Sequence, residues 1–143
     1  MTTRTQVVEC ARSFLGTPFH HQARLKHVGV DCIGLVIGVA RELNLIAPDF
    51  DIQAYPRIPD GTTLLDTARQ HMTEIDKSTV QPGDVVVISF GLLPQHFGFF
   101  GDYRHGGLSI IHAASNAGKV IETRLMFSSS MKYVAAFALP GIA

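Results

Sequence analysis

Apolar residues recur at helical spacing in three segments of the first half of the chain. They are residues 5–15, 32–44 and 64–75. Spacings of three and four residues place such side chains on one helix face, so each segment is predicted to be a helix. Gly16-Thr17-Pro18 ends the first, and prolines prevent regular structure between residues 45 and 59. Residues 19–30 are irregular and polar, which predicts a loop leading to Asp31 as the N-cap of the second helix.

The second half changes character after the turn signal Gln81-Pro82-Gly83, where short β-type runs begin. These runs are residues 84–90, 96–100, 108–112, 119–122 and 133–139. Glycine-rich turns separate several of them, as expected for hairpins. Helices followed by strands predict one α+β domain over residues 1–143, with an antiparallel sheet packed on the helix of residues 32–44. We expect the strands to form a single meander.

Composition and charge argue against several classes of partner and location. The chain of 143 residues has 12 basic and 12 acidic side chains, and no basic cluster, so we expect no nucleic-acid partner. The N-terminus lacks the apolar stretch of a signal peptide, and no apolar run approaches the roughly 18 residues of a membrane span. We therefore expect neither a signal peptide nor membrane insertion. Two cysteines are too few for a disulfide framework, which leaves a reactive thiol as an option.

Cys32 stands where the second predicted helix begins, directly after Asp31. A helix start offers unpaired backbone N–H groups and partial positive charge, which favour a thiolate and stabilise an oxyanion. This position makes Cys32 a candidate nucleophile. Cys10 falls inside the first predicted helix, where a free cysteine is usually a packing residue.

A cysteine hydrolase also needs an imidazole beside the thiol and a third polar group that orients the imidazole. Lowering a thiol pKa by about three units requires about 4 kcal/mol, whereas a helix terminus contributes about 0.3 to 1 kcal/mol. A cationic histidine is therefore expected to supply most of the stabilisation. His96 begins one predicted strand and His112 ends the next, so adjacent strands can bring the two rings together.

Four motifs occur in the order found in the NlpC/P60 family of papain-like cysteine peptidases, which this chain resembles over nearly its whole length. They are Asp31-Cys32-Ile33-Gly34, Pro82-Gly83-Asp84, His96-Phe97-Gly98 and Ile111-His112-Ala113. The resemblance implies a papain-like α+β fold with Cys32 as nucleophile, His96 as base and His112 as its orienting partner. It implies no metal and no cofactor.

The chain also resembles the bacteriophage tail-associated branch of that family, at Gly16-Thr17-Pro18-Phe19, at residues 55–61 and at residues 136–141. This implies hydrolysis of an amide bond in peptidoglycan stem peptides through a thioester acyl-enzyme. The expected partners are the stem peptide and phage tail-tip proteins. The expected location is a virion tail that is assembled in the bacterial cytoplasm and acts on the host cell wall.

Three positions are expected to contact substrate: Asp31, Phe19 and Ile33. Many cell-wall members of the family have Ser after the nucleophile and an aromatic hydroxyl in the preceding loop, where this chain has Ile33 and Phe19. The resemblance therefore does not extend to specificity for D-γ-glutamyl substrates. Asp31 can pair with a substrate amine by analogy, although its role as helix N-cap requires no substrate.

Two alternatives of other classes stay open at this point. The domain can be a structural or binding component of a phage tail tip with a weak or latent site. It can also be a zinc hydrolase that uses His20, His21 and His27, although neighbouring residues rarely ligate one ion and no zinc-ligand spacing is present.

Overall fold

The structure, a computed structural model, describes residues 1–52, 55, 62–90, 94–129 and 131–142 of the chain. Its helices are α1 (Arg4–Arg12), α2 (Cys32–Glu42) and α3 (Thr63–His71). A small hairpin consists of β1 (Arg24–Leu25) and β2 (Gly29–Val30). The main sheet consists of β3 (Thr73–Ile75), β4 (Val85–Ser89), β5 (Pro94–Asp102), β6 (Leu108–Ala114), β7 (Lys119–Arg124) and β8 (Lys132–Ala138). The predicted α+β class is confirmed.

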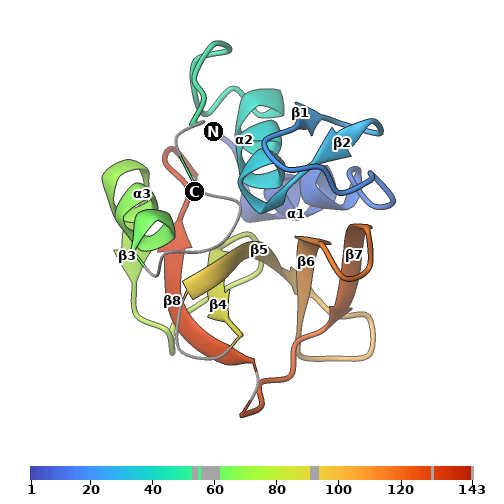
Figure 1. Ribbon diagram of the computed structural model, residues 1–143. Helices are drawn as coiled ribbons and strands as arrows, with labels where there is room; N and C mark the ends of the chain where they lie inside the picture. The colour runs from blue at the N-terminus through green and yellow to red at the C-terminus, as the bar shows by residue number, and fades with distance from the viewer. Residues whose placement is uncertain (53–54, 56–61, 91–93, 130, 143) are drawn as a thin grey trace.

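The main sheet is antiparallel throughout, in the order β3-β8-β4-β5-β6-β7. Figure 1 shows α1 and α2 together above the sheet, with α3 beside β3 and β8. The predicted meander is correct for β4 to β7 but wrong for β8, which returns to pair with β4. Ala135, Ala136 and Phe137 of β8 are buried, whereas β7 ends in exposed charged residues that suit a sheet edge.

The third predicted helix is shorter than expected. The sequence pattern extends it to Ile75, but α3 ends at His71, and Met72 is already extended. Residues Thr73 to Ile75 form β3 instead, and Ile75 pairs with Ala136 of β8. The backbone groups of β8 thereby gain partners that a longer helix would leave unpaired.

Helix starts follow local chemistry. A capping box formed by Thr3 and Gln6 starts α1. Asp31 caps α2 as predicted, since its side chain accepts a hydrogen bond from the backbone N–H of Gly34.

The β1–β2 hairpin lies inside residues 19–30, which were predicted to form only a loop. Among the described residues, no helix has the length and apolar character that a membrane crossing requires.

Alternation along β4, β5 and β6 gives the sheet two apolar faces. One set packs with α1 and α2 and includes Val85, Val87, Phe97, Phe99 and Ile111. The alternate set forms a second cluster and includes Val86, Ile88, Phe100, Ile110 and Ala136. Neighbouring residues of a strand therefore lie in different environments, and this separation defines the site below.

Gly34 allows α2 to approach the β1–β2 hairpin. A Cβ at this position would lie 2.1 Å from the carbonyl oxygen of Ala23 and 3.2 Å from Nη1 of Arg24. Because a backbone carbonyl cannot rotate away, this close contact requires glycine. The last residue of the Asp31-Cys32-Ile33-Gly34 motif is thus explained by packing.

We predict that Gly34→Ala lowers the free energy of unfolding by about 2–3 kcal/mol through overpacking, more than any gain in helix propensity. Gly38→Ala is the matched control, because a Cβ there would meet Cζ of the Phe14 ring at 2.7 Å, and a side chain can shift. Urea denaturation of both variants measures the difference. Equal stability of the two variants would contradict the packing argument.

Candidate active site

The nucleophile turn is held by a buried carboxylate. Asp31 is extended, with φ of −103° and ψ of −169°, and its Oδ1 accepts from the N–H of Gly34 at 2.7 Å. The cap leaves Cys32 as the first residue of α2, where the N–H groups of the first turn have no helical partner.

The two oxygens of Asp31 are also hydrogen-bonded by three further groups. Nη1 of Arg24 lies 3.2 Å from Oδ1, while the Tyr55 hydroxyl and the Gln22 backbone N–H each lie 2.6 Å from Oδ2. The Asp31 side chain is 4% exposed. The capping role is confirmed. The expected pairing with a substrate amine stays a prediction, which the hydrogen bonds already made by both oxygens disfavour.

His96 and His112 lie side by side on β5 and β6. Nε2 of His96 is 2.6 Å from Nδ1 of His112, and the rings meet edge to face at 4.8 Å between centroids. Extending the Phe99–Ile111 register places His112 opposite Gly98, so the two histidines are diagonal neighbours on one face. A Cβ at Gly98 would lie 2.8 Å from Cγ1 of Ile110, which explains the glycine of the His96-Phe97-Gly98 motif.

The sulfur of Cys32 lies against the same strand. The backbone N–H groups of Phe97, Ile33 and Cys32 lie near it and lower the pKa of the thiol, against the larger effect of burial, which raises this pKa. The sulfur is therefore one residue away from the His96 backbone. Since Nε2 of His96 is engaged by His112, Nδ1 is the ring nitrogen left for a proton exchange with the thiol.

Burial shifts the pKa of Cys32, His96 and His112 toward the neutral form of each side chain. Burial raises the pKa of Cys32 to about 12, and it lowers the pKa of His96 to about 3 together with the neighbouring His112. Burial also lowers the pKa of His112 to about 4. Burial thus disfavours each charge taken alone, and the expected ionisation of the sulfur by the helix start and a cationic histidine stays a prediction. The thiolate and the imidazolium must form together, because adjacent opposite charges attract in a buried site.

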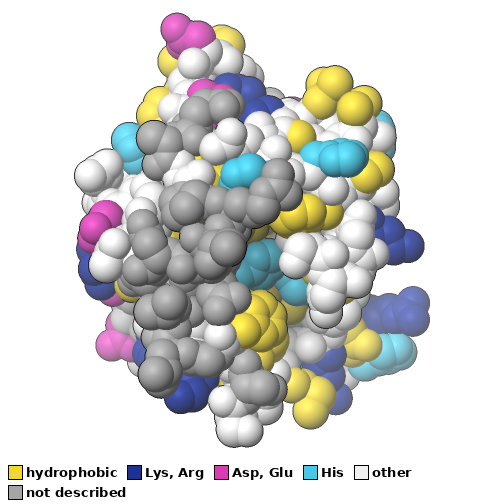
Figure 2. Space-filling view, viewed as in Figure 1, with side chains coloured by type: hydrophobic (Ala, Val, Ile, Leu, Met, Phe, Trp, Pro, Cys, Tyr) yellow, Lys and Arg dark blue, Asp and Glu magenta, His cyan; other side chains and the backbone are white. Residues whose placement is uncertain are grey.

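A cavity of about 260 Å³ adjoins the two histidines, and its lining combines aromatic, small and polar side chains. The lining residues are Phe90, His96, His112, Ala114, Ser115 and Asn116. Figure 2 shows histidine side chains near the middle of this face, beside hydrophobic surface. Sequence reasoning missed Phe90, Ser115 and Asn116, although the alternation 112, 114, 116 places every second residue after His112 on the cleft side.

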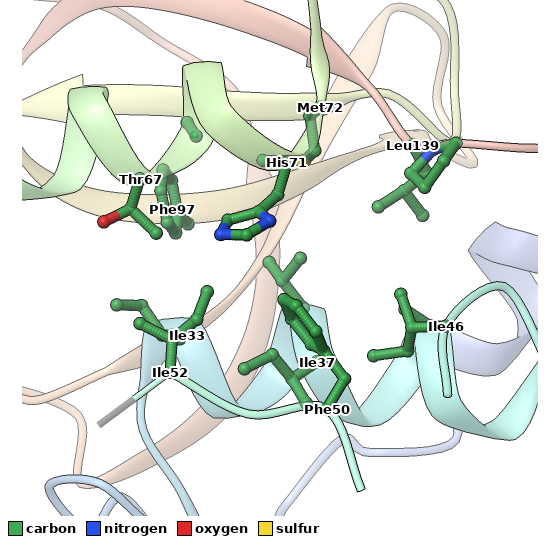
Figure 3. A pocket seen from close by; sticks show the side chains of 14 residues that line it. Ile33, Ile37, Ile46, Phe50, Ile52, Thr67, His71, Met72, Phe97 and Leu139 are labelled. Atoms are coloured by element: carbon green, nitrogen blue, oxygen red, sulfur yellow. The ribbon is translucent and has the colours of Figure 1, made fainter. Parts of the chain in front are cut away.

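Ile33 faces a different pocket. This second cavity, of about 110 Å³, is bounded by α2, α3 and Phe97, and Figure 3 shows Ile33 and Ile37 opposite Thr67, His71 and Phe97. Because Phe97 and His96 are neighbours on β5, their side chains point to opposite faces. Ile33 is 3% exposed and lies on the side of α2 that packs toward Phe97, so its expected substrate contact stays a prediction.

The other residues considered in the sequence, Phe19, the three loop histidines and Cys10, lie outside the lining of the cleft. Phe19 packs partly buried against the core, and its N–H donates to the Gly118 carbonyl at 2.8 Å, so a substrate contact of its ring stays a prediction. In the part of the chain that the structure describes, His20, His21 and His27 belong to no cluster of three metal-ligating side chains. The Cys10 thiol donates to Glu42 at 3.1 Å, away from the cleft residues.

The sequence of this domain matches a known protein family. The family model described as NlpC/P60 family matches residues 16–138. The chain belongs to the NlpC/P60 family. This membership makes the domain an enzyme of the cysteine peptidase type. No curated protein sequence matches the chain significantly.

Solved NlpC/P60 structures share the fold. The chain is similar to the NlpC/p60 domain of the peptidoglycan hydrolase SagA, with a TM-score of 0.66, 19% identity, and coverage of 96% of this chain and 100% of that one. An NlpC/P60 family protein from Bacillus cereus gives a TM-score of 0.67 and 18% identity, covering 95% of this chain and 40% of that one. The peptidoglycan hydrolase RipB from Mycobacterium tuberculosis gives 0.60 and 19%, covering 96% and 64%. The chain thus spans the SagA domain but only part of the longer proteins.

We predict that His96→Ala slows alkylation of Cys32 by iodoacetamide about 100-fold at about pH 7, because the buried thiol then has no partner for its proton. The measurement uses a Cys10→Ser background, so that Cys32 is the one thiol of the chain. His71→Ala is the control, since His71 lies at the end of α3 and contacts Phe50. Equal rates in the His96 variant and the control would refute the coupling.

The orienting role of His112 predicts an order among its variants. His112→Asn keeps an acceptor at the position of Nδ1 and should retain Cys32 alkylation within about tenfold, with His112→Gln next. His112→Ala and His112→Leu should lose about 100-fold, since Nε2–H of His96 then has no acceptor. Thermal unfolding verifies that all four variants are folded. The same loss in all four would argue against orientation by a hydrogen bond.

Proposed function

We propose that the chain hydrolyses an amide bond in peptidoglycan stem peptides, with Cys32 as nucleophile, His96 as base and acid, and His112 as the partner that orients His96. The observation that carries the proposal is the contact between His96 and His112 on strands β5 and β6, with the Cys32 sulfur near the backbone of the next β5 residue, Phe97, in a chain of the NlpC/P60 family. SagA and RipB, which share its fold, are peptidoglycan hydrolases by name.

The geometry gives each step a donor and an acceptor. Nδ1 of His96 takes the Cys32 proton as the sulfur attacks the carbonyl, and a thioester forms when His96 returns that proton to the departing amine. Water then attacks the thioester, again with His96 as base, and the thiol leaves. The N–H groups of Cys32 and Ile33, which already lie against the sulfur, are placed to donate to the oxyanion.

His112 must stay neutral in this scheme. Its Nδ1 accepts from Nε2–H of His96 when His96 is cationic, and a protonated His112 would have only donors. Burial, which lowers the pKa of His112 to about 4, keeps this ring neutral at physiological pH. Burial therefore disfavours a resting ion pair but preserves the acceptor that the reaction needs.

The finer assignment rests on sequence resemblance. The segments 16–19 and 136–141 support a bacteriophage tail-associated enzyme, while residues 56–61 of the third segment lie outside the described residues. On this proposal the protein joins a tail tip in the bacterial cytoplasm and opens the host wall during genome delivery. The competing proposal, a tail component with a latent site, is favoured by the burial that keeps Cys32 and His96 neutral.

Mass spectrometry of muropeptides from defined cell walls tests the reaction. The purified chain should release stem-peptide fragments, and Cys32→Ala should reduce the release by at least about 1000-fold, because no other nucleophile replaces the thiol. Cys10→Ala is the matched control and should keep the parent rate. Identical digests from the parent and Cys32→Ala would leave only the latent, structural role.

A further inference from the structure

Arg24 is a buried hub beside the nucleophile turn. Its guanidinium has five N–H donors, and all five have acceptors. These are Oδ1 of Asp51 at 2.7 Å, the carbonyls of Ala23 at 3.0 Å and Ile52 at 2.6 Å, the Tyr55 hydroxyl at 2.8 Å and Oδ1 of Asp31 at 3.2 Å. The side chain is 9% exposed. Arg24 thus joins the β1–β2 hairpin and the start of α2 to Asp51, Ile52 and Tyr55.

The contacts of Arg24 also explain why the Asp31 carboxylate is enclosed. Arg24 donates to one carboxylate oxygen and to the Tyr55 hydroxyl, which in turn donates to the other oxygen. His21 adds a third neighbour, with Nδ1 at 3.8 Å from Oδ2. The negative charge next to Cys32 is consequently paired with a cation and shielded from the cleft.

We propose that Arg24 is a positioning and specificity-determining residue, which fixes the Cys32 turn through Asp31 and closes that carboxylate to the substrate. This inference rests on the proposed function. An acyl donor with a free α-amine next to the scissile bond would find no open oxygen on Asp31. Among the described residues that line the cleft, none carries a carboxylate either. The matching substrate class is a stem peptide whose α-amine is acylated, as it is while joined to the glycan.

Two synthetic stem peptides that differ only in an acetylated or free α-amine test the substrate class. The parent should cleave the acetylated peptide with kcat/KM at least equal to that of the free amine. Arg24→Gln should shift the kcat/KM ratio about fivefold toward the free amine, because it removes the cation that pairs with Asp31. A parent that requires the free amine, or an unchanged ratio in Arg24→Gln, would overturn the inference.

A thiol-labelling experiment decides the role of Arg24 without hydrolysis. In a Cys10→Ser background, Cys32 is modified by two methanethiosulfonates, one neutral and one carrying an ammonium group. Arg24→Gln should raise the ammonium-to-neutral rate ratio about fivefold, and adding Asp31→Asn should reverse the rise. No rise, or a rise that survives Asp31→Asn, would refute the shielding of Asp31. If the parent cleaves neither peptide, the proposed hydrolysis fails, and this ratio still tests Arg24.

Two further variants separate positioning from general stability. Tyr55→Phe changes no charge but removes one of the two donors to Oδ2 of Asp31, so it should shift both ratios in the same direction as Arg24→Gln by a smaller factor. It also serves if Arg24→Gln fails to fold. Arg41→Gln is the matched control at the other end of α2, where Nη2 donates to the Phe50 carbonyl at 2.6 Å. It should shift neither ratio. A merely structural Arg24 would change stability in these variants without changing either selectivity.

Discussion

The hydrogen bonds of the Asp31 carboxylate determine where the catalytic turn lies. One oxygen caps α2 through the Gly34 N–H, and the second accepts from Gln22 and Tyr55. Because an unpaired buried carboxylate is strongly unfavourable, the Asp31 side chain, in a residue that is 3% exposed, depends on these donors. The position of Cys32 therefore depends on segments that are distant from it in sequence.

Strand β5 divides the chemistry of the molecule between its two faces. Phe97 fills space between α2 and α3, while His96 points toward His112 and the cleft. A shift of the β4–β5 register by one residue would exchange the two side chains and place an imidazole in the apolar core. The register irregularity between Ile88 and Ser89, next to the residue paired with His96, is where the strand pairing adapts at the site.

Local patterns predicted the elements that depend on nearby residues. The cap of α2 follows from Asp31, and the strands of the second half follow from their apolar runs. The pairing of β8 with β4 and the end of α3 at His71 were missed, since both depend on backbone partners far along the chain. Cys32, His96 and His112 could be chosen because hydrolytic chemistry restricts residue types. Arg24 could not, because nothing in the sequence near it indicates that Asp31, Asp51 and Tyr55 converge there.

The buried environment disfavours charged side chains at rest and strengthens the attraction between opposite charges once they form. Desolvation disfavours a charge on the thiol and on each imidazole, so in the proposed reaction the charges of Cys32 and His96 must arise together, with His112 hydrogen-bonded to His96. Once formed, they attract one another more strongly than they would in water. Reactivity then depends on the relative positions of these three side chains rather than on a permanently ionised sulfur. Arg24 contributes to that register from outside the cleft, because the turn that carries the sulfur can move only if the Asp31 hydrogen bonds break.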